Sequence, residues 1–443
     1  MASAAEQLAA NLNLSTFAKA TELQSRIWFT LGALIVYRLG TYIPIPGIDP
    51  QAFANAFQNQ AGGILGMFNM FSGGAVERMA IFALNVMPYI SASIIVQLMT
   101  TAVPSWEKLK KEGEAGRKQL NQYTRYLTVV LAFFQATGIA MGLERSQGIV
   151  LNPGLFFIAT TVVTLVGGTM FLMWLGEQIT ARGVGNGVSL IIFAGIVAAM
   201  PTAIGQALNL TRVGDLSWFA LLVILVIVVA VIVFVVFVER SQRRLLIQYP
   251  KRQQGNRMFQ GESSFLPLKI NTSGVIPPIF ASSLLLLPAT FTSFASENSP
   301  EWIQAIAASI GYGQPLHMAL YALGIIFFCF FYTSIVFNPE ETADNLRKYG
   351  GFLPGIRPGR KTAEYLDYVL TRLTVIGAAY LTIVCLLPEV LISYYKVPFY
   401  LGGTSLLIVV SVTMDTVTQV QSHLLAHQYE GLIKKTRLRG RKR

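Results

Sequence analysis

The sequence predicts an all-α polytopic membrane protein of about ten transmembrane helices, and three observations lead to this fold class. First, 53% of the 443 residues are hydrophobic and only 13% are charged, and the mean hydropathy is +0.53. Soluble globular domains do not have this composition. Second, ten apolar runs are long enough to cross a bilayer, which needs roughly 20 helical residues. Third, the basic residues are concentrated in alternate loops.

The ten apolar runs are spread along the chain and are separated by polar loops. Their approximate limits are residues 27–43, 79–103, 126–143, 155–175, 188–204, 217–238, 270–291, 317–337, 373–387 and 401–420. The ninth run is the shortest, since Pro388 and Glu389 interrupt it.

The distribution of Lys and Arg predicts the orientation. With a cytoplasmic N-terminal segment, residues 1–26, the cytoplasmic segments hold 28 of the 34 basic residues and the opposite loops hold 4. This asymmetry is the positive-inside pattern, so both chain ends are expected in the cytoplasm. The most basic cytoplasmic segments are residues 104–125, 239–269 and 338–370 and the tail 421–443.

An eleventh apolar stretch, residues 61–75, is flanked by glycines and is too short to span. Irregular backbone at membrane depth is tolerated only where protein or a watery cavity shelters it. The stretch therefore fits a re-entrant or capping helix. An interfacial helix lying on the outer surface fits the composition equally well.

The seventh run contains an unusual number of helix-breaking residues, which are Gly274, Pro277, Pro278 and Pro288. The double proline removes two backbone donors, which predicts a kink or a mobile segment. Prolines that serve helix packing alone are the alternative.

Ionisable side chains inside the apolar runs are rare. Arg38 lies in the last third of the first run, where it can snorkel outward, and Asp415 lies near the cytoplasmic end of the tenth. Neither has an evident proton-relay partner, so an ion-coupled pump is not indicated. His423 and His427 stand four residues apart, but no third metal ligand is evident and a solvated tail face explains them.

Motifs of enzyme chemistry are also missing from the sequence. It contains no nucleophile elbow, P-loop or HExxH motif. Cys329 and Cys385 fall inside apolar runs, where thiols act as small buried hydrophobes. We therefore predict no enzymatic activity, no cofactor and no metal, and expect a protein that moves or holds something.

Two cytoplasmic segments, residues 239–260 and 338–361, are long, basic and punctuated by Gly and Pro. In the second, Gly355, Pro358 and Gly359 bracket Arg357, which favours a tight turn that presents one cation. Such surfaces suit an acidic protein partner or RNA phosphates. The alternative is that the charges serve topology and contact anionic lipid heads only.

Six long stretches carry a family resemblance. They are IPIPGID at 43–49, MFNMFSGGA at 67–75, MPYISASIIVQL at 87–98, MWLGEQITARGVGNG at 173–187, NPEETADNLRKYGGFLPGIRPG at 338–359 and KVPFYLGGTSLLIVV at 396–410. In these stretches, and in their order, the sequence resembles the SecY family, the channel subunits of the bacterial Sec protein translocase.

The resemblance implies two inverted five-helix halves, residues 27–210 and 211–420, around an hourglass pore, with a lateral gate between the second and seventh spans. It makes the segment 62–74 a plug, which favours the re-entrant interpretation. Its plug residues are Gly66, Met67, Phe68, Asn69, Met70, Phe71 and Ser72. It implies a pore ring of Val86, Ile90, Val188, Ile192, Ile279 and Ile408. Without the resemblance, these aliphatic residues would be read as helix packing.

The resemblance also places polar residues in the gate and basic residues on the docking face. Gln97, Asn271 and Ser282 are expected to hydrogen-bond across the closed gate seam. The motor ATPase SecA and the ribosome are expected to dock on a set of cytoplasmic cations, which are Arg357, Lys348, Arg244, Lys251, Arg252 and Arg257. Asn256 and Glu340 depart from the family pattern, since basic residues often occupy these positions, so the detailed footprint is expected to differ.

The function that follows is a passive protein-conducting channel in the bacterial plasma membrane. It would pass unfolded secretory polypeptides across the membrane and release transmembrane segments sideways into it. The resemblance implies SecE and SecG as membrane partners, signal sequences and preproteins as substrates, and anionic lipids at the surface. A secondary transporter of small solutes is the alternative, but it would need a polar site at mid-membrane. An intramembrane hydrolase lacks a catalytic pair.

Overall fold

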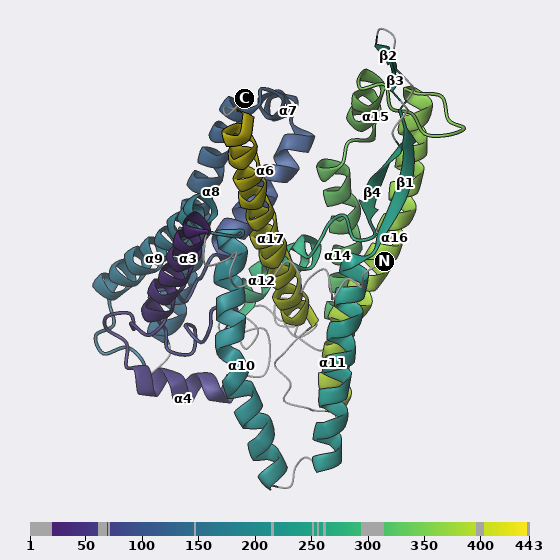
Figure 1. Cartoon of the computed structure of the whole chain (residues 1–443). Coiled ribbons are helices and arrows are strands. Elements are labelled where there is room, and N and C mark those ends of the chain that lie inside the picture. The colour runs from purple at the N-terminus through teal and green to yellow at the C-terminus, as the bar shows by residue number, and fades with distance from the viewer. Residues whose placement is uncertain are drawn as a thin grey trace. The chain divides into compact units, whose positions relative to one another are not determined.

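The computed structural model describes most of the chain, namely residues 20–60, 69, 71–145, 148–213, 217–249, 252–254, 257–259, 263–293, 314–395 and 403–440. Helices dominate this part of the chain (Figure 1). The helices outside the basic loops are α3 (Thr21–Gly40), α4 (Pro50–Gln60), α6 (Met87–Ala102), α8 (Glu114–Arg145), α9 (Leu155–Arg182), α10 (Gly187–Val213), α11 (Trp218–Arg240), α12 (Ile276–Ser293), α14 (Pro315–Val336), α16 (Arg360–Tyr395) and α17 (Gly403–Gly440).

The chain divides into two compact units. Unit 1 comprises Met1–Gly205, Pro288–Ala307 and Val412–Arg443, and unit 2 comprises Gln206–Leu287 and Ala308–Ser411. The predicted halves, residues 27–210 and 211–420, and their inverted relation stay a prediction.

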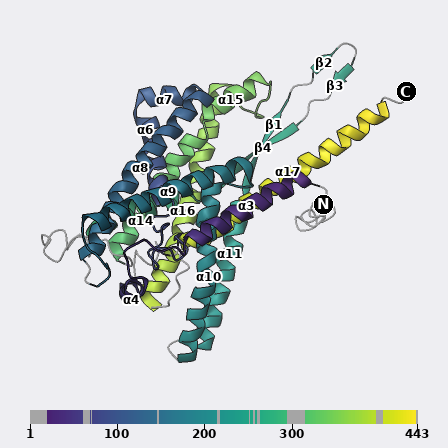
Figure 2. The ribbon, with the colours of Figure 1, turned by 90° about the vertical axis from the view of Figure 1, so that its left-hand side faces the viewer.

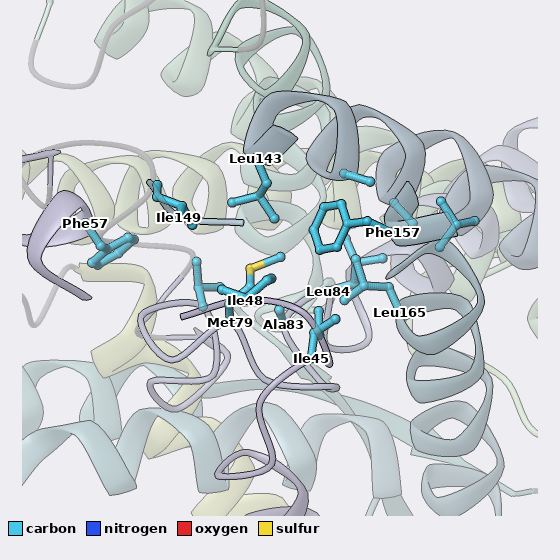
Figure 3. Close-up of a cluster of buried hydrophobic side chains, with 14 residues drawn as sticks. Ile45, Ile48, Phe57, Met79, Ala83, Leu84, Leu143, Ile149, Phe157 and Leu165 are labelled. Atoms are coloured by element: carbon cyan, nitrogen blue, oxygen red, sulfur yellow. The ribbon is translucent and has the colours of Figure 1, made fainter. Parts of the chain in front are cut away.

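In unit 1, α8 packs against both α6 and α9, and α9 also contacts α3. A buried cluster joins α8 and α9 to the loops that precede α6 (Figure 3); it includes Ile45, Leu84, Leu143 and Leu165. The middle of α17 lies beside α3 (Figure 2), where Leu23 and Leu424 share a second buried cluster. Helices at both ends of the sequence thus belong to the same unit.

The second apolar run is helical over only part of its predicted length, residues 79–103. Residues 79–86 form turns, in which Met79 has φ 44° and Asn85 has φ 50°. The turns are sheltered by protein, since Ala80 and Val86 are fully buried, and their backbone pairs with residues 43–45 through Ile45 N to Met79 O at 3.0 Å. Hydropathy identified apolar residues here but did not distinguish burial in protein from burial in lipid.

The helix of the ninth run extends past the end of its apolar stretch, because α16 continues through Pro388 to Tyr395. Proline leaves the carbonyl of Val384 without its helical donor. The start of α17 lies against that carbonyl, since a Cβ on Gly403 would be 1.9 Å from the Val384 oxygen. A neighbouring helix therefore packs closely against α16 at the carbonyl whose helical donor Pro388 removes.

The double proline of the seventh run does not kink a span. Pro277 and Pro278 lie in the first turn of α12, which begins at Ile276. The first amides of a helix have no intrahelical acceptor, so proline costs no hydrogen bond there. The pair therefore starts the helix. The preceding turn contains Gly274 at φ +64°.

The described parts of the two basic segments also contain regular secondary structure. The first forms antiparallel hairpins, with β1 (Gln242–Gln248) paired to β4 (Ser263–Lys269) and β2 (Arg252–Gln254) paired to β3 (Arg257–Phe259). The second contains the helix α15 (Pro339–Lys348). A further basic segment, earlier in the chain, contains α7 (Pro104–Lys111), which follows α6 after a 100° bend. The sequence did not predict the strands, because their apolar and basic residues do not alternate regularly.

Every predicted span overlaps a helix. In the described part of the chain seven helices are long and apolar enough to cross a membrane, or eight if α6 and α7 count as one bent span. α3 and α12 are not among these helices. In α3, Arg26 and Arg38 lower the hydropathy, and in α12 the described apolar part, Ile276–Leu285, is short. The total of ten spans stays a prediction.

Candidate functional site

The C-terminal part of the predicted plug forms a compact turn, which we call the stem and define as residues 69 and 71–77. Asn69 Oδ1 accepts from Glu77 N at 2.9 Å, and Asn69 O accepts from Gly74 N at 2.9 Å. Ser72 Oγ donates to Asn69 O at 3.0 Å. The other predicted plug residues, which are Gly66, Met67, Phe68 and Met70, lie outside the described residues.

Three side chains of unit 1 hold the stem by its backbone carbonyls. The Tyr37 hydroxyl donates to Ser72 O at 3.2 Å, and Asn85 Nδ2 donates to Phe71 O at 2.6 Å. Arg38 Nη1 donates to Gly73 O. Tyr37 and Asn85 are almost completely buried, so these hydrogen bonds are shielded from water.

α10 supports the stem from another side. A Cβ on Gly195 would lie 2.5 Å from Phe71 O, so only glycine permits this approach. Arg38 also lies over the ring of Tyr42, 4.9 Å from its centroid, and Arg78 lies 4.1 Å from it. The sequence alone assigned Arg38 to snorkelling. Its charge instead reaches the stem and an aromatic ring, and its position four residues before Tyr42 was the available signal.

The six aliphatic residues of the predicted pore ring occupy helix ends and helix faces in both units. Val86 and Ile90 stand one turn apart at the start of α6, as do Val188 and Ile192 in α10, and all four belong to unit 1. Residues one turn apart share a helix face. Ile279 in α12 and Ile408 in α17 belong to unit 2. That the six form one ring stays a prediction.

The three predicted gate residues have different environments. Gln97 Oε1 is buried and no donor among the described residues reaches it. Ser282 Oγ donates to Ile279 O of its own helix at 2.9 Å. Asn271 Nδ2 donates to Glu239 Oε1 at 2.7 Å and to Gly274 O at 3.0 Å. Asn271 thus uses its donors within unit 2, which the sequence did not foresee.

Parts of the two basic segments form one folded body, which we call the docking element and define as β1, β4 and residues 337–373. Gln248 and Phe352 exchange backbone hydrogen bonds at 2.9 and 3.0 Å. Beneath this bridge the strands, the loop and α16 share a buried core of leucine and valine. Its buried members are Leu245, Leu268, Leu353, Leu366, Val369, Leu370 and Leu373. In Figure 1 the strands accordingly run alongside the end of α16.

The docking element presents its cations to solvent. Arg244, Lys348 and Arg357 are exposed. Arg252 and Arg257 lie beyond the docking element, on the paired strands β2 and β3, and Lys251 lies outside the described residues. Glu340 is in the first turn of α15 behind the N-cap Asn338, whose Oδ1 accepts from Glu340 N at 3.1 Å. A carboxylate there favours the helix dipole, which gives this departure from the family pattern a local structural reason.

One buried ionisable pair is present in unit 2. His317 Nδ1 lies 2.8 Å from Glu389 Oε1, and both side chains are less than a tenth exposed. The pair connects the first turn of α14 with the end of α16, and Tyr321 Oη lies 2.6 Å from Thr404 Oγ1 nearby. In the described part of the chain, no group of three His, Cys, Asp or Glu side chains could hold a metal ion.

Comparison with known proteins places these features in a family. The profile of the SecY family matches residues 80–417. The chain is 57% identical to protein translocase subunit SecY of Escherichia coli K12 over 423 residues, which cover 95% of this chain and 96% of that protein. The chain belongs to the SecY family. SecY of Pseudomonas aeruginosa is also 57% identical and covers 95% of each chain.

Solved structures agree on the SecY fold. A structure described as a protein conducting channel matches 90% of this chain and 92% of its own, with a TM-score of 0.64 at 16% identity. Sec61 in a canine ribosome–channel complex from the endoplasmic reticulum matches with a TM-score of 0.60 over the same shares. At this identity the likeness shows the fold alone. The chain is a multi-pass membrane protein of the SecY family.

Proposed function

We propose that the chain is the channel-forming subunit of a bacterial Sec translocase, through which unfolded polypeptides cross or enter the plasma membrane. The observation that carries this proposal is the 57% identity to translocase subunits over 95% of the chain. Such a channel supplies a path and no chemistry, which agrees with the absence of enzyme motifs in the sequence. No observation favours a small-solute transporter.

The pore would be constricted by the six aliphatic residues Val86, Ile90, Val188, Ile192, Ile279 and Ile408. Aliphatic side chains pack around a passing chain of any sequence, and they offer water and ions no polar partner. A photo-cross-linking amino acid at Ile90 should capture a stalled preprotein. The control position is Val233, which lies on α11 and is 63% exposed. Capture at Val233 but not at Ile90 would defeat the pore assignment.

The plug, residues 62–74, would close the idle channel, with the stem as its fixed end. The three side chains that hold the stem support this role, because they bind backbone carbonyls and so fix its position whatever the plug's side chains do. Each such hydrogen bond contributes about 0.5–1.5 kcal/mol, which is small enough to break during transport.

The lateral gate would lie between α6 and α12. Gln97 is the residue best suited to the seam, since its buried acceptor oxygen costs free energy until a donor reaches it. Ser282 and Asn271 would contribute to the gate from α12 and from the turn before it. Gln97→Leu removes this cost from the closed state and should therefore raise the barrier to gate opening. An unchanged response to signal sequences would remove Gln97 from the gate.

The docking element would bind the motor ATPase SecA and, during co-translational insertion, ribosomal RNA phosphates. Exposed arginines on a rigid body support this role, because they neutralise acidic surfaces without needing sequence readout. SecE and SecG would complete the complex, and anionic lipids would contact the same basic face. Both chain ends would be cytoplasmic.

The docking proposal is tested by charge reversal. Arg357→Glu should block motor-driven export and weaken SecA binding, while the channel still inserts and folds. Lys110→Glu makes the same charge change at an exposed position on α7 and should leave export near the parent rate. Normal export by the Arg357 variant would refute the assignment.

A further inference from the structure

The docking element is joined to the start of α12 by a turn of only a few residues. β1 begins two residues after the end of α11, and β4 ends at Lys269, shortly before α12 begins at Ile276. The base of the hairpin is closed by Ile270 N, which donates to Ser241 O at 3.1 Å. Any tilt of the hairpin therefore reaches the first turn of α12 through residues 270–275.

A group of polar side chains, Glu239, Asn271 and Ser273, fixes this turn, and we call the group the clamp. Asn271 Nδ2 donates both to Glu239 Oε1 at the end of α11 and to Gly274 O in the turn itself. Ser273 Oγ donates to Asn271 Oδ1 at 3.0 Å. Asn271 is 3% exposed and Ser273 is 5% exposed. One amide thus joins the two ends of the hairpin to the turn that precedes α12.

The clamp also rests on the body of unit 2. A Cβ on Gly377 of α16 would lie 3.1 Å from Ile270 O and 3.6 Å from the Cα of Asn271. On another side, Ser273 Oγ lies 3.8 Å from Cys329 Sγ of α14. Because α16 also carries the buried core of the docking element, the hairpin and the clamp are both packed against α16.

Gly274 is the pivot between this body and α12. Its φ of +64° is in the left-handed region, and a Cβ there would meet nothing within 4 Å. Packing therefore does not fix the pivot, and the hydrogen bond from Asn271 to its carbonyl does. Without that bond, glycine has access to many backbone conformations.

We propose that Asn271 is a positioning residue that sets the resting orientation of α12 and transmits movements of the docking element to it. This role rests on the proposed function, in which α12 borders the gate and partners bind the docking element. In this proposal Asn271 holds the turn before α12 and does not form a hydrogen bond across the gate seam. The clamp would make docking on the cytoplasmic side bias the gate before any substrate enters.

Hydrogen–deuterium exchange of the full chain, in bilayer nanodiscs with its membrane partners, tests the proposal. Asn271→Leu keeps the side-chain size and removes all three hydrogen bonds. Amide exchange in residues 274–285 should become roughly tenfold faster, because hydrogen bonds that involve a charged group are among the strongest in proteins. SecA binding should stay within about twofold, but the exchange change that SecA causes in 274–285 of the parent chain should be lost.

The control variants separate the clamp from general damage. Thr272→Ala removes a neighbouring side chain that donates only to Lys269 O at 3.0 Å and should behave like the parent. Glu239→Gln retains an acceptor for Asn271 and should keep most of the protection seen in the parent chain. Ser273→Ala removes one bond and should give an intermediate effect, which keeps the test available if the Asn271 variant does not accumulate.

The outcomes are distinguishable. Parent-like exchange and a parent-like response to SecA in Asn271→Leu would overturn the clamp, as would an equal effect of Thr272→Ala. Failure of the parent chain to bind SecA would instead overturn the docking proposal. Faster exchange in the resting Asn271 variant would then still support the clamp as the element that orients α12.

Discussion

At the scale of single residues, backbone carbonyls are the groups on which the stem depends. Tyr37, Arg38 and Asn85 each donate to a different stem carbonyl. Asn85 can do so because asparagine tolerates its positive φ. A side chain that binds backbone tolerates variation in the plug, so the holding residues rather than the plug residues determine how firmly the stem is seated.

Tyr37→Phe should increase ion leakage through the idle channel, because it removes the hydroxyl that binds Ser72 O and leaves the ring in place. The loss of about 0.5–1.5 kcal/mol corresponds to roughly a 2- to 13-fold shift toward the open form. Conductance of the complex in planar bilayers measures the change. Tyr321→Phe removes a buried hydroxyl in unit 2 and serves as the control. Equal leakage in both variants would point to general loosening.

Gly403→Ala should destabilise unit 2 by about 1–3 kcal/mol, because the new methyl group has no room beside the Val384 carbonyl. The midpoint of thermal unfolding in detergent should fall. Gly167→Ala is the matched helical control, since a Cβ at Gly167 meets nothing within 4 Å, and its midpoint should not fall. A parent-like midpoint for the Gly403 variant would contradict the close approach of α16 and α17.

At the scale of elements, the docking element owes its shape to a small hydrophobic core. Leu353 and Leu366 are 4% and 0% exposed although both belong to a segment rich in charge. Sequence reasoning identified the cations of this segment but not the core, because its leucines are spread over three separate stretches and no single stretch has a helical or strand period. The pairing of Gln248 with Phe352 is equally non-local.

Leu353→Ala should loosen the loop that carries Arg357 without disturbing the spans. Large-to-small changes in a core cost about 2–5 kcal/mol, and here the loss falls on a few residues. Hydrogen exchange in residues 349–359 should accelerate, and SecA binding should weaken. Leu151→Ala, which changes a leucine that is 68% exposed, provides the comparison. Unchanged exchange in the Leu353 variant would show that the core does not hold the loop.

Elements also show where prolines can be misread. A sequence count treats Pro277, Pro278 and Pro388 alike, as helix breakers. In the structure the first two start α12 and the third lies inside α16, where Gly403 of α17 approaches the unpaired carbonyl. The deciding quantity is the position of each proline within its helix, and composition alone does not show where a helix begins or ends.

At the scale of the whole molecule, composition and charge were sufficient for the membrane class, and each predicted span overlaps a helix. Composition and charge could not show whether an apolar run is surrounded by lipid or by protein. Residues 79–86 are as apolar as a span, yet they are turns buried within unit 1. The clamp could not be predicted from the sequence either, because Glu239 and Asn271 are separated by the whole hairpin in the sequence and come together only in the folded chain.

The proposed orientation is a property of the whole chain and can be tested from outside the cell. Cysteine at Leu151, in the loop before α9, should react with a membrane-impermeant thiol reagent in intact cells. Cysteine at Lys110 should react only after the membrane is opened. The native Cys329 and Cys385 are buried and should contribute little background. The reverse labelling pattern would invert the orientation derived from the basic loops.

The shared core of the docking element also has a consequence for biosynthesis. Leu245 and Leu268 are translated well before Leu366 and Leu373, because α14 and α15 intervene in the sequence. During synthesis the leucines of the hairpin therefore stay uncovered until α16 has been translated. A nascent, truncated or prematurely released chain has no finished docking face. If SecA docks there as proposed, the order of translation would allow only a nearly complete subunit to recruit it.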